Sequence, residues 1–233
     1  MGKRDQQSVD AVNVLSSVIR PLATGAEIRV TRSTARGAVV CMNGGQRREI
    51  VGTWSATLEW LVRRLAPRFP ELGFAEVRYR IKSWKRMDWC VADARAAIRE
   101  GGAPRTLLLG FSMGGAVAVC AADEGSVVGV VALAPWLPDR LRLDPLVGRR
   151  LAVIHGGLDR SLPGVPGIRP ESSRRGFERA LALGVEGSYT LIPGAVHGAA
   201  LRLPRGAAIP LPRARRWADA VSLELARFQA SGG

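Results

Sequence analysis

The sequence has few of the residues that build metal sites and disulfide frameworks. Its 233 residues include only two histidines and three cysteines. Cys41, Cys90 and Cys120 form no Cys-x-x-Cys pair and are odd in number, which argues against a zinc site and a disulfide framework. The sequence also lacks a Gly-x-Gly-x-x-Gly loop and a Walker loop. We therefore expect no metal and no cofactor, and we expect the thiols to be packing residues.

Long hydrophobic runs are absent as well. The longest apolar run, Val127 to Leu137, is far too short to span a bilayer. Lys3 and Arg4 lie near the N-terminus, but Asp5 and Asp10 follow where a signal peptide needs an unbroken apolar region. We therefore expect a cytoplasmic protein with no membrane partner.

Lysine is scarce although the chain is strongly basic. The net charge is +14, and all but three of the 34 basic residues are arginines. The arginines are spread along the chain instead of clustering in one arm, which favours a generally cationic surface over a nucleic-acid partner. We also hypothesise that this charge favours a small anionic acyl substrate. The sequence leaves the oligomeric state open.

Short apolar runs alternate with longer stretches of helical period. This pattern is typical of a mostly parallel sheet with helices on both faces, and 233 residues fit one α/β domain, residues 1–233. We expect about seven or eight strands. Seven can be located from the pattern: Glu27 to Arg32, Ala38 to Met42, Ala75 to Arg80, Arg105 to Gly110, Val127 to Ala134, Leu151 to His155 and Ser188 to Ile192.

Helices are expected between these strands. Apolar residues repeat at helical spacing from Trp54 to Leu65, and again after a possible N-cap at Asp88. Two further helices are expected, from Pro170 to about Leu183 and from Ala214 to Gln229. The proline-rich segments 158–170 and 198–212 are expected to be loops at the edge of the sheet that carries ligands.

The most informative motif is Gly110-Phe111-Ser112-Met113-Gly114. It follows an apolar strand and precedes a helix-like stretch, Ala116 to Ala122. A serine hydroxyl is a poor nucleophile and needs a sharp turn on which a base can reach its proton. Glycine is needed two residues before and after Ser112, because a side chain there would collide with neighbouring backbone.

A base and an orienting acid are then required. His197 lies in a loop after a strand, whereas His155 ends a strand, where a buried and satisfied imidazole is the commoner explanation; we favour His197 as the base. Asp159 follows the Gly156-Gly157 turn and is the preferred acid, with Asp139 and Asp144 as alternatives.

The order Ser112, Asp159, His197, each after its own strand, resembles the α/β-hydrolase superfamily, in particular small cap-less serine esterases, dienelactone hydrolases and serine aminopeptidases. The resemblance covers the chain from about residue 27 to its last helix and implies an α/β-hydrolase fold. It also implies an oxyanion hole formed by the backbone N–H groups of Met113 and Gly45, with Gln46 as the alternative to Gly45. Many relatives have His-Gly where this chain has Asn43-Gly44.

Only sixteen residues, 135–150, separate two of the expected strands, which leaves no room for a cap domain. We therefore expect an open site. Its expected pocket residues are Asn43, Gly44, Trp84, Trp136, Leu137 and Leu162.

These features predict a cofactor-independent serine hydrolase that acts on carboxylic esters or thioesters through an acyl-enzyme, and a peptidase is not distinguished from it. Two alternatives stay open. The first is a non-catalytic binding module with a basic surface, and the second is an acyltransferase or perhydrolase that uses the same three residues.

Overall fold

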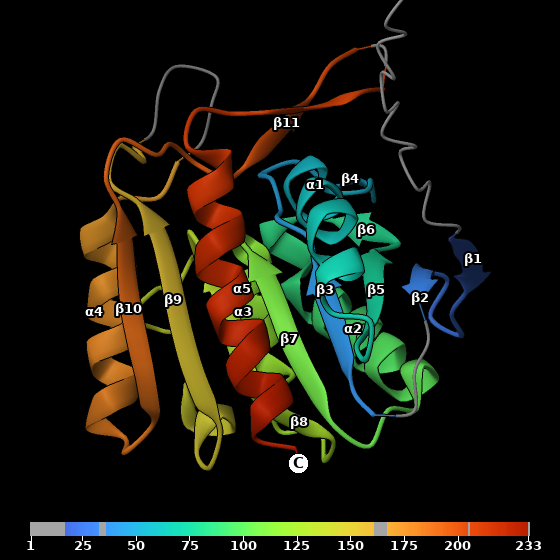
Figure 1. The fold of residues 1–233 in the computed structure, drawn as a ribbon, viewed down its shortest axis with the longest axis horizontal. Coiled ribbons are helices and arrows are strands. Elements are labelled where there is room, and N and C mark those ends of the chain that lie inside the picture. The colour runs from blue at the N-terminus through green and yellow to red at the C-terminus, as the bar shows by residue number, and fades with distance from the viewer. Residues whose placement is uncertain (1–16, 33–35, 161–166, 205, 233) are drawn as a thin grey trace, which may run out of the picture.

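The computed structural model describes residues 17–32, 36–160, 167–204 and 206–232. Its centre is an eight-stranded sheet with the order β1-β2-β5-β3-β7-β8-β9-β10 (Figure 1). The strands are β1 (Val18–Pro21), β2 (Glu27–Arg32), β3 (Ala38–Met42), β5 (Gly73–Arg78), β7 (Thr106–Phe111), β8 (Val127–Leu133), β9 (Arg150–Gly156) and β10 (Glu186–Ile192). The seven predicted strands are therefore confirmed, with ends that differ by two residues or fewer.

The sheet is parallel from β5 to β10, and antiparallel where β1 and β2 close one edge. The parallel strands β3, β7, β8 and β9 are buried almost throughout, as expected for strands that are covered on both faces. Their carboxyl ends meet at one edge. This edge carries the candidate site.

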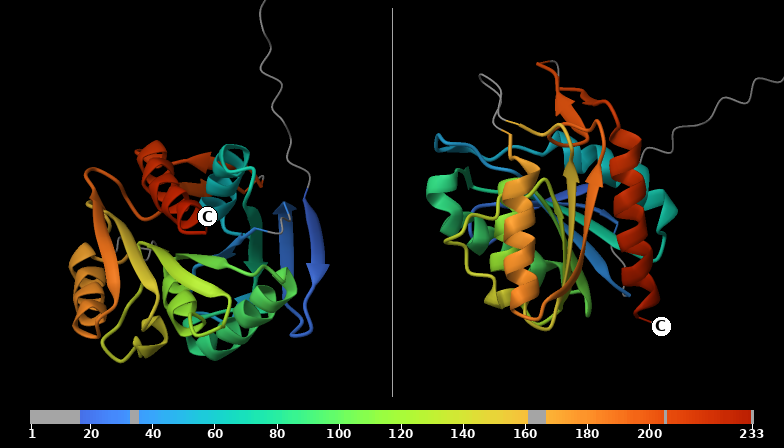
Figure 2. Two further views of the ribbon diagram at one scale, coloured as in Figure 1. Left: turned by 60° about the horizontal axis from the view of Figure 1, so that its bottom comes forward. Right: turned by 90° about the vertical axis from the view of Figure 1, so that its left-hand side faces the viewer.

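Helices cover both faces, as predicted (Figure 2). On one face lie α2 (Met87–Gly101), α3 (Met113–Cys120) and α4 (Pro170–Ala182), packed over a core that includes Val117 and Leu151. On the other face lie α1 (Ala56–Leu65) and α5 (Ala214–Ala230), whose Trp217 is fully buried. Two cores thus sandwich the sheet. Shorter 3-10 turns are η1 (Ala66–Arg68), η2 (Trp84–Arg86) and η3 (Asp144–Leu146).

Local chemistry explains where two of the helices begin, and one predicted N-cap is wrong. Ser55 precedes α1 and its hydroxyl accepts a hydrogen bond from the Leu58 N–H, while Pro170 opens α4. Asp88 is not an N-cap. The helix α2 begins one residue earlier at Met87, so Asp88 lies in its first turn, where a carboxylate still stabilises the helix dipole.

Residues 134–149, between β8 and β9, contain only η3, so there is no cap domain. The segment 198–212 is not a simple loop. It contains the antiparallel pair β11 (Ala200–Arg202) and β12 (Ala208–Pro210), which lies against α1. A second small pair joins β4 (Ile50–Val51) to β6 (Ile81–Lys82).

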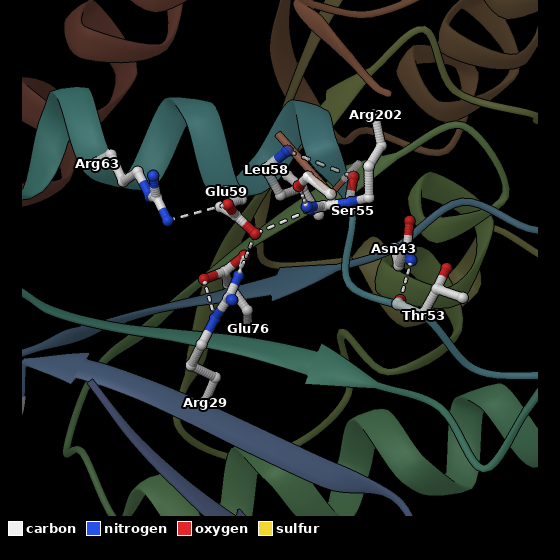
Figure 3. Close-up of polar contacts among 10 residues, drawn as sticks. Arg29, Asn43, Thr53, Ser55, Leu58, Glu59, Arg63, Glu76 and Arg202 are labelled. Atoms are coloured by element: carbon white, nitrogen blue, oxygen red, sulfur yellow. Dashed lines mark hydrogen bonds and ion pairs between the residues drawn. The ribbon is translucent and has the colours of Figure 1, made fainter. Parts of the chain in front are cut away.

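A largely buried ion-pair network links β2, β5, α1 and β11 (Figure 3). Arg29 on β2 binds both carboxylate oxygens of Glu76 on β5, at 2.7 and 2.9 Å, and reaches Glu59 on α1 at 3.1 Å. Glu59 also accepts a hydrogen bond from Arg202 on β11 at 2.9 Å and forms an ion pair with Arg63 at 3.1 Å. Burial raises the pKa of Glu76 even though Arg29 opposes this. The network therefore fixes the β11–β12 pair to α1.

The three thiols are free; Cys41 and Cys90 are buried and Cys120 is half-buried. In the described part of the chain, no helix combines the length and apolar character needed to cross a membrane.

Candidate active site

Ser112 lies on a strained turn between β7 and α3. Its φ is +57° and its ψ is −119°, a conformation that non-glycine residues rarely adopt. A Cβ added at Gly110 would overlap the carbonyl of Gly114, and one added at Gly114 would overlap the carbonyl of Met42. The glycine requirement inferred from the sequence is therefore confirmed, and the turn presents Ser112 at the carboxyl edge of the sheet.

A cavity of about 320 Å³ opens beside Ser112. It is lined by Asn43, Gly44, Gly45, Lys82, Trp84, Phe111, Ser112, Trp136, Gly167, Ile168 and His197. The Trp84 and Trp136 rings stack with their centroids 6.1 Å apart and form one wall. The fold thus brings together residues from six separate segments of the chain, including the predicted pocket residues Asn43, Gly44, Trp84 and Trp136.

His197 contacts Asp159 beside this cavity. The His197 Nδ1 and the Asp159 Oδ2 are 2.7 Å apart, and the Asp159 side chain is fully buried. Burial alone would raise the pKa of Asp159, but hydrogen bonds from His155 and His197 outweigh it and hold the pKa below its ordinary value. Asp159 is therefore an ionised acceptor for His197.

Backbone from two elements lies next to Ser112. Met113 is the first residue of α3, so its N–H has no partner within the helix. Gly44 is close enough that an added Cβ would lie 3.2 Å from the Ser112 Cβ, and a Cβ on Gly45 would overlap the Met113 side chain. Gly45 lines the cavity and Gln46 does not. Among the sequence candidates for a second N–H donor, this favours Gly45.

Residues 39–228 match the model of the alpha/beta hydrolase family. The chain belongs to this family. A search of curated proteins found no significant match to this alpha/beta hydrolase.

Solved alpha/beta hydrolase structures share the fold at low sequence identity. A sugar hydrolase (YeeB) from Lactococcus lactis has a TM-score of 0.67 and 16% identity, with 94% of this chain and 100% of that chain covered. The butyrate-bound esterase Est2 from Thermogutta terrifontis has a TM-score of 0.61 and 18% identity, with 91% and 92% covered. A dienelactone hydrolase from Anabaena variabilis has a TM-score of 0.59 and 17% identity, with 89% and 95% covered.

This alpha/beta hydrolase has a second histidine behind Asp159 that the sequence did not connect to the site. The fully buried His155 Nε2 lies 3.0 Å from the Asp159 Oδ2 and 2.8 Å from the Ile168 carbonyl oxygen. Both neighbours are acceptors, so Nε2 carries the proton. The His155 Nδ1 then accepts from the Ser173 hydroxyl at 2.7 Å, and Ser173 also contacts Tyr189 at 2.9 Å. The His155 imidazole is fully buried and both of its nitrogens are hydrogen-bonded, which confirms the expectation from the sequence.

The loop that carries His197 is anchored on its far side by Thr57 of α1. The Thr57 hydroxyl accepts from the N–H groups of Ala199 and Ala200 and donates to the Ala200 carbonyl. Gly198 has a φ of +90°, and an added Cβ would lie 2.6 Å from the Thr57 hydroxyl oxygen. The chain therefore needs glycine directly after His197.

Some predicted residues lie elsewhere. Leu137 is not a cavity residue: its side chain is buried in the core against Gly176 of α4, because the chain turns inward after Trp136. Asp139 and Asp144 pair with Arg179 and Arg142, respectively. Leu162 lies outside the described residues.

Four residues that line the cavity were not predicted from the sequence: Lys82, Phe111, Gly167 and Ile168. The Phe111 ring lies against the His197 imidazole, with centroids 4.9 Å apart. Only their positions in the sequence could have indicated two of them, because Phe111 is inside the serine motif and Lys82 follows β5 by a few residues.

A larger cavity of about 430 Å³ lies at the opposite edge, between α5 and the starts of β8 and β9. Two of its charged side chains, Arg150 and Arg227, both pair with the third, Glu224. It offers no nucleophile with a neighbouring base, so it is a weaker candidate.

Proposed function

We propose that this chain is a cofactor-independent serine hydrolase that cleaves carboxylic esters or thioesters. Membership in the alpha/beta hydrolase family supports a hydrolase activity, and the structural neighbours include a protein named as an esterase. The observation that carries the proposal is the convergence at one cavity: Ser112 and His197 both line it, and Asp159 contacts His197 at 2.7 Å.

The proposed reaction follows from these contacts. With the Nδ1 proton of His197 donated to Asp159, Nε2 is the basic nitrogen that takes the proton of Ser112 as its Oγ attacks the acyl carbon. Asp159 stabilises the resulting imidazolium. The N–H groups of Met113 and Gly45 stabilise the oxyanion, and one such donor contributes about 3 kcal/mol.

The alcohol or thiol then leaves with the proton held by His197, and an acyl-enzyme forms on Ser112. Water, activated by the same imidazole, releases the carboxylic acid. Because the segment between β8 and β9 forms no cap domain, we expect water to reach the acyl-enzyme.

Ser112→Ala tests the proposal. We expect the variant to fold as the wild type does, to lose hydrolysis of short p-nitrophenyl esters and to lose labelling by a fluorophosphonate probe. Ser222→Ala is the matched control, because Ser222 is on α5 and does not line the cavity. Full activity in Ser112→Ala would refute the proposal. A wild type with neither hydrolysis nor labelling would favour the non-catalytic binding module instead.

A further inference from the structure

Lys82 provides a cation inside the candidate active site. It is one of three lysines in the chain and lies at the end of β6, where it lines the cavity together with Ser112. Its ammonium donates a hydrogen bond to the Thr53 hydroxyl at 2.8 Å. Thr53 in turn accepts a hydrogen bond through its carbonyl from the Asn43 amide at 2.6 Å, which Figure 3 shows. Lys82 is thereby connected to the loop next to the serine turn.

No acidic side chain in the described part of the chain neutralises this cation. Among the described residues, no Asp or Glu oxygen lies within ion-pair distance of the Lys82 ammonium, and none of the cavity residues is acidic. The carboxylates on neighbouring segments are already paired, Glu49 with Arg86 and Asp93 with Arg80, both at 3.1 Å. Burial without a countercharge lowers the pKa of Lys82. A half-buried ammonium that is left unpaired favours an anion from outside the chain.

The other residues of the cavity indicate which kind of ligand would bear the anionic group. Its large apolar side chains are the stacked Trp84 and Trp136 rings together with Phe111 and Ile168. A cavity of about 320 Å³ that combines these apolar walls with one lysine fits a small ligand that has an apolar body and a single anionic end.

We propose that Lys82 is the specificity-determining residue of this site and that its substrates are small esters or thioesters bearing a carboxylate. The inference rests on the proposed function. The carboxylate binds the Lys82 ammonium while the ester carbonyl lies at Ser112, and the aromatic wall holds the apolar segment between them. A charge-assisted hydrogen bond of this kind corresponds to about a 10- to 100-fold preference.

Two matched substrate pairs test this and distinguish which end of the ester carries the charge. Monomethyl glutarate and methyl valerate differ in the acyl end, and 3-acetoxybenzoate and phenyl acetate differ in the leaving group. The measured quantity is the ratio of kcat/KM for the anionic and neutral member of each pair at low salt. We expect Lys82→Met to lower this ratio about 10- to 100-fold in at least one pair, mainly through KM.

Two further variants complete the experiment. Lys82→Arg keeps the charge and should retain most of the ratio. Lys85→Met removes the same charge from an exposed position outside the cavity and should leave the ratio unchanged. Equal ratios in wild type and Lys82→Met for both pairs, or an equal loss in Lys85→Met, would overturn the proposal.

A binding measurement separates this proposal from the proposed function. If the wild type hydrolyses no ester, the serine hydrolase proposal fails, and Lys82 is judged by calorimetric titration with glutarate. Binding that weakens at least tenfold in Lys82→Met and is unchanged in Lys85→Met would support the anion site. Equal binding in both variants, or no binding to the wild type, would refute it.

Discussion

Asp159→Asn provides the sharpest test of how the site is held together. In the wild type, the Asp159 Oδ2 faces His155 and His197, while its Oδ1 accepts from the Ile168 N–H at 3.1 Å. An asparagine has only one acceptor oxygen. If that oxygen faces the histidines, the amide NH₂ meets the Ile168 N–H; if it faces Ile168, the NH₂ meets both imidazoles.

Either orientation of the asparagine amide destabilises the folded protein. Loss of a hydrogen bond to a buried charged group, together with one unpaired donor, should lower the free energy of unfolding by about 3 kcal/mol. In the second orientation, the Nδ1 of His197 becomes an acceptor, so Nε2 carries the proton and cannot act as a base. We therefore expect kcat to fall about 10³- to 10⁴-fold, which corresponds to roughly 4 to 5.5 kcal/mol.

The assay combines ester hydrolysis at neutral pH with urea unfolding across pH. The pKa of Asp159 is lowered in the folded state, so the carboxylate contributes stability above its unfolded pKa of about 3.9. That contribution is lost as the pH falls through the lower folded pKa. The difference in unfolding free energy between wild type and Asp159→Asn should therefore narrow below about pH 4. Asp219→Asn, on the exposed face of α5, is the control. A variant that keeps more than about a tenth of kcat would refute this account.

Two further predictions concern His155 and Arg29, which hold buried carboxylates outside the cavity. His155→Leu removes the buried donor to Asp159 and should lower stability by about 2 kcal/mol and kcat about tenfold, as measured by urea unfolding and ester kinetics; an unchanged kcat would show that the reaction does not depend on the contact between His155 and Asp159. Arg29→Met leaves Glu76 buried without its bidentate partner and should cost about 3 to 5 kcal/mol at pH 7. Because the pKa of Glu76 is already raised by burial, its protonation should make this loss smaller near pH 5 than at pH 8, and a loss independent of pH would contradict the reasoning.

The serine turn could be predicted because its constraints are local. The spacing of Gly110, Ser112 and Gly114 already excludes side chains at two positions, and the structure shows the backbone atoms they would strike. The buried parallel strands were also predictable, since their apolar runs are nearly continuous. The order of Asp159 and His197 along the chain, each after a strand, placed both at the same edge.

Other features depended on contacts between distant segments. The sequence gives no sign that Leu137 turns into the core under α4 while its neighbour Trp136 lines the cavity. His155 and Ser173 are eighteen residues apart, and their hydrogen bond forms because α4 packs on β9. Neither arrangement follows from spacing or composition.

The amino-acid sequence by itself determined seven of the strands in the sheet, its helices and the turn that presents Ser112, because steric and apolar patterns act between near neighbours. Only the tertiary structure decided the surroundings of the charged groups. It joined His155 to Asp159, and through the pairing of β4 with β6 it placed Lys82 beside Ser112 with no acidic partner among the described residues. The electrostatics of a buried charge depend on which distant groups reach it, and that is settled by the packing of the whole chain.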